Sequence, residues 1–142
     1  LGFTPSSGEE LQTEYMVPRS SAREALEAVR RVADVVAPVL QISEIRTVAA
    51  DNLWLSPCQG RDTVCIHFTW VEDSEAVAPA LLAVERELAP YAARPHWGKV
   101  FSTDPAVVRS LYPRLNDFQD LRDRLDPQRV FANAFVDRYL DR

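Results

Sequence analysis

Lysine is almost absent from this sequence. The 142 residues include 16 lysines and arginines together, and Lys99 is the only lysine among them. GC-rich codons favour arginine, alanine, valine and proline, so coding bias explains the missing lysines without any function. The functional explanation is that position 99 needs an amine, a compact charge whose pKa responds to its surroundings more readily than that of arginine. The scarcity of lysine alone leaves both explanations open.

The sequence also lacks an excess of basic charge and a long apolar run. Its formal net charge is −5, whereas domains that bind nucleic acids carry basic stripes. No apolar run approaches the ~18 residues of a membrane-spanning helix, and the N-terminus has no signal-peptide pattern. We therefore expect no nucleic-acid partner, no membrane span and a cytoplasmic location.

Histidine and cysteine are too few for a zinc centre of the usual kind. The two histidines, His67 and His96, do not form a zinc-binding pattern with the two cysteines. Cys58 and Cys65 read as reduced thiols in an acidic domain, with a disulfide between them as the alternative. We expect no metal in this chain.

The chain begins at Leu1 and not at an initiator methionine, and residues 1–10 have the composition of a loop. We expect a piece of a longer protein, and a processed or trimmed chain is the alternative. The hydrophobic fraction of 46% and charged fraction of 26% are typical of globular domains.

Hydrophobic periodicity predicts an α+β fold. Strand-like segments, helical spacing and proline boundaries give the order strand, helix, strand, strand, helix, strand. This is the order of a ferredoxin-like split βαβ unit, an antiparallel sheet with helices on one face. The predicted strands cover residues 11–17, 39–49, 63–71 and 94–101, and the predicted helices cover residues 22–36 and 74–89.

Three further helices are predicted after residue 102, and they form a C-terminal helical tail. Asp104-Pro105 begins the first, the second ends at Leu125, and the third contains Phe131 and Leu140. The sheet unit is already complete at residue 101. The tail therefore packs against a domain outside this chain or on the open face of the sheet. We take residues 1–101 as one domain and residues 102–142 as the tail.

Charged and polar residues on two predicted strands share a face. Side chains alternate across a strand, so Glu44 and Arg46 project together, as do His67 and Thr69. If the two strands are neighbours, these four side chains line one patch. A solvent-exposed ion pair and an ordinary hydrogen-bonded histidine are the structural alternatives.

The segment His96-Trp97-Gly98-Lys99 adds a cation, and glycine beside tryptophan suggests a close approach of the backbone to a ring or a ligand. No nucleophile motif and no glycine-rich phosphate loop accompany these residues. The inventory suits binding of a polyhydroxylated or anionic ligand.

Four motifs in order resemble the C-terminal half of the sugar-lactone and alditol oxidases, which are flavoproteins of the vanillyl-alcohol-oxidase type. The stretch Ile66-His67-Phe68-Thr69-Trp70 is more similar to the alditol oxidases than to the aldonolactone oxidases. The four motifs are Glu44-x-Arg46, Leu55-Ser56-Pro57-Cys58, Arg94-Pro95-His96-Trp97-x-Lys99 and Asp126-Pro127-x-Arg129-Val130-Phe131-x-Asn133.

The resemblance implies a function for the parent protein. Alditol oxidases oxidise the terminal alcohol of a polyol such as xylitol or sorbitol to the aldehyde and reduce O₂ to H₂O₂. They hold FAD covalently in an N-terminal domain, so the cofactor-binding residues are expected mainly in that domain. The chain alone is then expected to bind no FAD and to be inactive, with that domain and a small polyol as its partners.

The resemblance also implies the site residues. The substrate-binding positions of the family match Glu44, Arg46, His67, Thr69 and Lys99. Arg46 and Lys99 are the expected catalytic residues, because preorganised cations hold the alkoxide that develops as hydride leaves an alcohol carbon.

Two other functions remain open at this point. One is the substrate domain of an aldonolactone oxidase, similar to D-arabinono-1,4-lactone oxidase. The other is a non-catalytic ferredoxin-like module for binding or dimerisation, which scattered positions of the five residues would favour.

Overall fold

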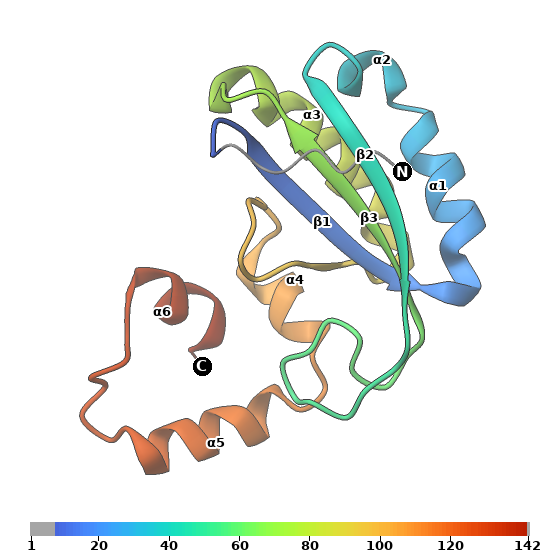
Figure 1. Ribbon diagram of the computed structural model, residues 1–142. Coiled ribbons are helices and arrows are strands. Elements are labelled where there is room, and N and C mark those ends of the chain that lie inside the picture. Colours follow the sequence, from blue (N-terminus) through green and yellow to red (C-terminus); the bar gives the residue numbers. More distant parts are fainter. Residues whose placement is uncertain (1–7, 142) are drawn as a thin grey trace.

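The computed structural model describes residues 8–141, so residues 1–7 of the expected N-terminal loop lie outside the described part. Its centre is a four-stranded antiparallel sheet in the order β2-β3-β1-β4, which confirms the predicted α+β, ferredoxin-like arrangement (Figure 1). The strands are β1 (Leu11–Pro18), β2 (Leu40–Val48), β3 (Thr63–Trp70) and β4 (Arg94–Pro95).

Among residues 8–141, helices cover one face of the sheet and no helix covers the other, which we call the open face (Figure 1). The covering helices are α1 (Ala22–Arg30), α2 (Ala33–Val36) and α3 (Ser74–Leu88). Alternate residues of β1 and β3 point toward them, and the core includes Tyr15, Ile66, Phe68, Trp70 and Val84. The opposite set of alternate residues faces away from the helices.

The first helix is interrupted where a single helix over residues 22–36 was predicted. The amides of Arg31 and Val32 donate to the carbonyls three residues earlier, Ala28 and Val29. This tightening breaks the regular i to i−4 pattern. A valine-rich stretch with lower helix propensity follows it.

The last strand is also shorter than predicted. Only Arg94–Pro95 forms a ladder with β1, because Pro95 has no amide hydrogen and the chain turns at His96. The rest of the predicted segment, residues 96–101, is a turn followed by irregular chain.

The tail builds a small core of its own. Its helices are α4 (Pro105–Ser110), α5 (Leu115–Leu125) and α6 (Ala134–Leu140). Tyr112, Leu115 and Tyr139 pack there, and Trp97 and Phe101 pack against them. The tail helices therefore pack beside the sheet unit, around the segment that follows β4 (Figure 1).

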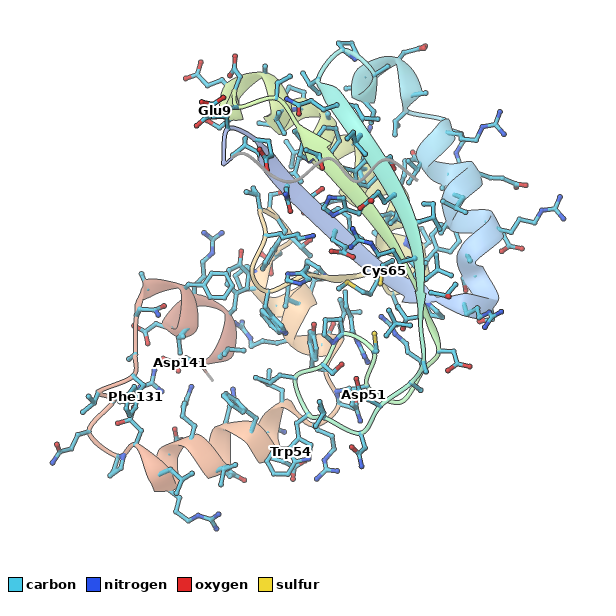
Figure 2. The ribbon with its side chains drawn as sticks, viewed as in Figure 1. Glu9, Asp51, Trp54, Cys65, Phe131 and Asp141 are labelled. Atoms are coloured by element: carbon cyan, nitrogen blue, oxygen red, sulfur yellow. The ribbon has the colours of Figure 1, made fainter. Side chains whose placement is uncertain are left out.

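Figure 2 labels two features at one end of the sheet: Cys65, near the start of β3, and Asp51 and Trp54 in the loop that joins β2 to β3. Asp51 closes this loop by accepting hydrogen bonds from Ser56 Oγ at 2.5 Å and from the amide of Leu53 at 3.0 Å. The loop is therefore an ordered support at one end of the sheet.

Candidate functional site

Strand register places three ionisable side chains in one row across the open face. Glu44 of β2 lies opposite His67 of β3, and His67 lies opposite Glu14 of β1. Because facing residues of antiparallel strands project to the same side, all three point away from the helices. Arg46 and Thr69 lie two residues from Glu44 and His67, so they share this face.

Lys99 reaches the same row from a tight turn. The amide of His96 donates to the carbonyl of Glu14 at 2.9 Å, and the amide of Val100 donates to the carbonyl of Gln12 at 2.9 Å. Both ends of the turn are therefore attached to β1. Within it, the amide of Lys99 donates to the carbonyl of His96 at 3.1 Å.

Two neighbours of Lys99 stiffen the turn. Trp97 Nε1 donates to the carbonyl of Leu55 at 2.9 Å, and the amide of Gly98 donates to His96 Nδ1 at 3.0 Å. A side chain at position 98 would bring its Cβ to 3.4 Å from His96 Cε1. The close approach expected at Gly98 is therefore to the ring of His96.

Glu14 is the centre of the cluster, with a side chain only 6% exposed. Its Oε2 accepts a hydrogen bond from Lys99 Nζ at 2.5 Å, and its Oε1 accepts one from Arg46 Nη1 at 3.4 Å. Arg46 also donates to Glu44 through Nη2. One buried carboxylate thus joins Arg46 and Lys99, the two cations whose catalytic role is implied by the family resemblance.

Glu14 is not among the site residues predicted from the sequence. Alternation along residues 11–17 places Glu14 on the face opposite Tyr15, and the ferredoxin-like strand order makes this strand the neighbour of residues 63–71. Those two signals together would have placed a carboxylate beside His67.

Hydrogen bonding fixes the tautomer of His67. Lys99 Nζ lies 2.8 Å from His67 Nδ1, and a lysine ammonium can only donate, so Nδ1 accepts. The ring hydrogen is then on Nε2, which lies 3.1 Å from Thr69 Oγ1 and donates to it. The Thr69 hydroxyl keeps its own hydrogen to donate to another group.

Charges in the cluster balance. Burial, and then the charge of Lys99, lower the pKa of His67, so its imidazole is neutral near pH 7. Burial would raise the pKa of Glu14, but the hydrogen bond and charge of Lys99, with the charge of Arg46, lower it overall. Two cations therefore face two carboxylates, Glu14 and Glu44.

The two carboxylates of the cluster differ in burial, and the Glu44–Arg46 pair is the solvent-exposed ion pair named above as a structural alternative. Glu44 and Arg46 form an ion pair whose side chains are 47% and 48% exposed, so it is not a buried pair. The buried carboxylate is Glu14. Edge strand β2 exposes its open-face side chains to solvent.

The structure brings the five predicted site residues, Glu44, Arg46, His67, Thr69 and Lys99, onto one face and connects them through Glu14. Glu44 and Arg46 are 47% and 48% exposed, whereas Lys99 is 16% and His67 is 5% exposed. Two cavities of about 380 Å³ and 160 Å³ lie elsewhere, lined by residues such as Tyr112 and Leu88. A ligand on this face is enclosed only if a second surface covers it.

Other side chains of the motifs support the site without facing it. Arg94 is buried and donates to the carbonyls of Leu111 at 2.9 Å, Gln59 at 3.0 Å and Pro57 at 3.1 Å. It therefore ties the β2–β3 loop to the tail. Arg94 thus contacts the Leu55-Ser56-Pro57-Cys58 motif directly, and both have a structural role.

Both cysteines are free and buried, which agrees with their interpretation as reduced thiols. Burial, and then the charge of Glu14, raise the pKa of Cys65 to about 11, so this thiol is protonated and unreactive near pH 7. Among residues 8–141 no group of three or more histidine, cysteine or acidic residues is placed to hold a metal ion.

The glycines of the described part of the chain are scattered. Gly8, Gly60 and Gly98 are far apart in the sequence, so residues 8–141 contain no glycine-rich turn of the kind that holds a pyrophosphate. The open face offers hydrogen-bond donors and acceptors for a small hydroxylated molecule instead.

Across residues 8–141 no helix combines the length and the apolar character needed to cross a membrane.

The chain matches a known protein family over nearly its whole length. The profile of the D-arabinono-1,4-lactone oxidase family matches residues 9–139. An alditol oxidase from a Streptomyces species is 56% identical over 139 residues, which cover 98% of this chain and 34% of that protein.

Two more distant relatives carry lactone names. An L-gulono-1,4-lactone dehydrogenase from Mycobacterium tuberculosis is 39% identical over 135 residues, covering 91% of this chain and 30% of that protein. An L-gulonolactone oxidase from Mus musculus is 27% identical over 130 residues, covering 88% of this chain and 30% of that protein. The chain spans about a third of the length of these curated relatives.

Proposed function

The chain belongs to the D-arabinono-1,4-lactone oxidase family, and on that premise we propose that it is the substrate-binding part of a polyol oxidase. The parent enzyme oxidises a terminal primary alcohol, as in xylitol or sorbitol, to the aldehyde while O₂ becomes H₂O₂. The observation that carries the proposal is the convergence of Lys99 and Arg46 on one face beside Thr69 and Glu44.

The balanced charge of the cluster supports a neutral substrate. Two cations face Glu14 and Glu44, and His67 is neutral, so the face has no net charge with which to attract an anion. A polyol offers hydroxyl groups that both donate and accept, which suits a face that presents both kinds of partner. Of the two ligand classes open from the sequence, the polyhydroxylated one is favoured.

Lys99 and Arg46 have donors to spare for the reacting oxygen. An ammonium has three N–H groups, and Lys99 directs two of them to Glu14 and His67. We assign its third N–H, with the guanidinium of Arg46, to the hydroxyl oxygen whose negative charge develops during oxidation. Glu44 accepts from a neighbouring hydroxyl and orients Arg46, and Thr69, aligned by His67, donates to a further hydroxyl.

The electron acceptor of the reaction is a flavin, FAD, held by the part of the parent polypeptide outside this chain. That part also supplies the second surface that the open face needs. The tail favours such a neighbour, because Leu125, Val130 and Phe131 are 73%, 70% and 83% exposed. Residues 1–101 are then the substrate domain, and residues 102–142 pack on the flavin domain.

Two further properties of the chain stay predictions of the same proposal. The chain alone binds no FAD and is inactive, because the flavin site lies in the other domain. The enzyme is cytoplasmic, an expectation that the two free thiols support.

The alternative within the family is an aldonolactone oxidase. The higher identity to the alditol oxidase, 56% against 39% for the lactone dehydrogenase, favours the polyol. The non-catalytic module is disfavoured, because the five predicted residues meet on one face and because the profile of an oxidase family matches residues 9–139.

The experiment is a comparison of substrates with the purified full-length parent protein. Oxygen consumption and H₂O₂ formation are measured with xylitol, sorbitol, a galactonolactone and a gulonolactone. We expect kcat/KM for at least one polyol to exceed that for both lactones by at least tenfold. Higher kcat/KM with a lactone would favour the alternative, and turnover of none of the four would overturn the proposal.

A further inference from the structure

Glu14 is the one carboxylate of the cluster that is buried, and both of its oxygens are engaged. Oε2 accepts from Lys99 Nζ at 2.5 Å, and Oε1 accepts from Arg46 Nη1 at 3.4 Å. The same Oε2 lies 3.6 Å from His67 Nδ1. Because its side chain is 6% exposed and its oxygens already have partners, Glu14 lies beneath the face on which a ligand would rest.

The backbone of Glu14 holds the same turn as its side chain. Its carbonyl accepts the amide of His96, at the start of the turn that presents Lys99. The Lys99 ammonium then returns to the Glu14 carboxylate from the end of that turn. One residue of β1 thus fixes both the path of the turn and the position of the amine.

A need for stability does not explain a carboxylate at this place. Burying an ion pair removes two charges from water, and well-packed apolar residues in its place are often as stable or more so. Unlike an apolar side chain, a carboxylate accepts hydrogen bonds from two cations at once and neutralises one of their two charges.

We propose that Glu14 is a positioning residue that sets the spacing of Lys99 and Arg46 and keeps the face neutral, so that the site selects a neutral polyol over an anionic sugar acid. This inference rests on the proposed function. Glu14 acts through the two cations and not by contact with the substrate.

Glu14→Gln in the full-length protein tests both proposed effects of the carboxylate, the spacing of the two cations and the neutrality of the face. Glutamine has the same shape but only one acceptor oxygen, and its amide nitrogen donates, so it loses one of the two cations. The face then carries a net positive charge. We expect kcat/KM for the polyol to fall by about 10²-fold. We expect inhibition by a five-carbon aldonate, which adds a carboxylate to the same hydroxyls, to tighten by about tenfold.

Glu85→Gln is the matched control. Glu85 is another partly buried carboxylate that contacts β1, through Tyr15 Oη at 2.8 Å, and it also accepts from Ser102 Oγ at 2.5 Å. It lies on the helix-covered side of the sheet. Its variant should lose thermal stability while kcat/KM and the aldonate inhibition constant stay within about twofold of wild type.

Glu14→Asp keeps the proposal testable if Glu14→Gln does not fold. Aspartate keeps the charge but is one methylene shorter, so it no longer reaches both cations. We expect a fall of about tenfold in kcat/KM with wild-type aldonate inhibition.

The outcomes separate the two proposals. Unchanged kcat/KM in either Glu14 variant, or unchanged aldonate inhibition in Glu14→Gln, would overturn the role of Glu14 and leave the proposed function intact. A wild-type enzyme that oxidises neither polyols nor lactones would overturn the proposed function itself.

Discussion

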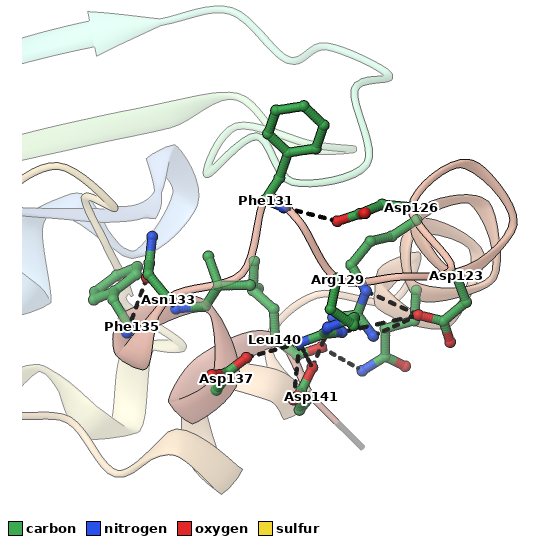
Figure 3. A network of polar contacts seen from close by, with 12 residues as sticks. Asp123, Asp126, Arg129, Phe131, Asn133, Phe135, Asp137, Leu140 and Asp141 are labelled. Carbon is green, nitrogen blue, oxygen red and sulfur yellow. Dashed lines mark hydrogen bonds and ion pairs between the residues drawn. The ribbon is translucent and has the colours of Figure 1, made fainter.

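Two networks of ionisable side chains, one on the sheet and one in the tail, differ in burial and in how many hydrogen-bond donors lack a partner among residues 8–141. The first, which we call the sheet network, consists of Glu14, Glu44, Arg46, His67 and Lys99. The second, the tail network, consists of Arg122, Asp123, Arg129, Asp137 and Asp141 (Figure 3).

The tail network directs its donors to partners within the tail. Arg129 donates to Asp137 at 2.7 Å and to Asp141 at 2.8 Å, and Arg122 donates to Asp141 at 2.8 Å and to the carbonyl of Leu140 at 3.1 Å. Its carboxylates are 37% to 50% exposed. Together with Asp126, which accepts from the amides of the Val130–Phe131 segment, it closes the loop between α5 and α6 and holds Phe131 outward (Figure 3).

The sheet network contains fewer charges but keeps donors unused. Its central carboxylate is buried. Lys99, and Thr69 as the hydrogen-bond partner of His67, each retain a hydrogen that has no acceptor within residues 8–141. The number of charged residues alone therefore does not identify a functional site. A buried carboxylate that holds cations with unused N–H donors indicates a binding function. Solvent-exposed ion pairs whose donors bind partners within the tail indicate a structural role.

The largest expected effect comes from Lys99→Met in the full-length enzyme. Methionine keeps the unbranched stem but removes the ammonium that binds Glu14 and His67. We expect kcat/KM for xylitol to fall by a factor that corresponds to about 2–4 kcal/mol. Steady-state oxygen consumption measures it, and near-normal kcat/KM would remove Lys99 from the reaction.

An intermediate effect is expected on the pH dependence of stability. Glu14 has a lowered pKa, so its stabilising contribution is complete above the unfolded value of about 4.5 and is lost as pH falls through the folded pKa. His67, also lowered, adds a loss that begins below its unfolded value of 6.5. The free energy of unfolding should therefore fall with decreasing pH from about 6.5 and more steeply below 4.5.

Glu14→Gln tests the lower part of this range. The variant lacks the proton uptake of Glu14, so the slope below pH 4.5 should decrease by up to about 1.4 kcal/mol per pH unit. Chemical denaturation at several pH values measures the slope. Identical slopes in wild type and variant would show that Glu14 is not charged and paired in the folded enzyme.

The smallest effect is expected in the tail network. Arg122→Ala removes contacts to Asp141 and to the carbonyl of Leu140 from a side chain that is 14% exposed. We expect a loss of about 1 kcal/mol in the free energy of unfolding with unchanged kcat/KM. A larger fall in kcat/KM than in stability would contradict the assignment of this network to structure.

Much of the fold follows from the sequence because alternation and proline boundaries act locally. The strands around Tyr15, Ile45 and Ile66 lie where periodicity predicts them, and Asp73 caps α3 through hydrogen bonds to the amides of Glu75 and Ala76. The break at Arg31 and the early end of β4 depend on single hydrogen bonds and on one proline, which periodicity does not resolve.

The site was predictable in part for the same reason. Glu44 with Arg46, and His67 with Thr69, are pairs within one strand, so alternation alone places each pair on a face. Glu14 was missed because its partner Lys99 is 85 residues away and meets it only through the β1 pairing. Its burial is a property of the assembled sheet.

The central claim is that the open sheet face binds the polyol. A crystal structure of the full-length enzyme with xylitol, obtained without oxygen, tests it most directly. We predict that one terminal oxygen of xylitol lies within hydrogen-bond distance of Lys99 Nζ and the Arg46 guanidinium, with another hydroxyl near Thr69 Oγ1. Xylitol bound elsewhere, with no contact to Lys99 or Arg46, would contradict the account.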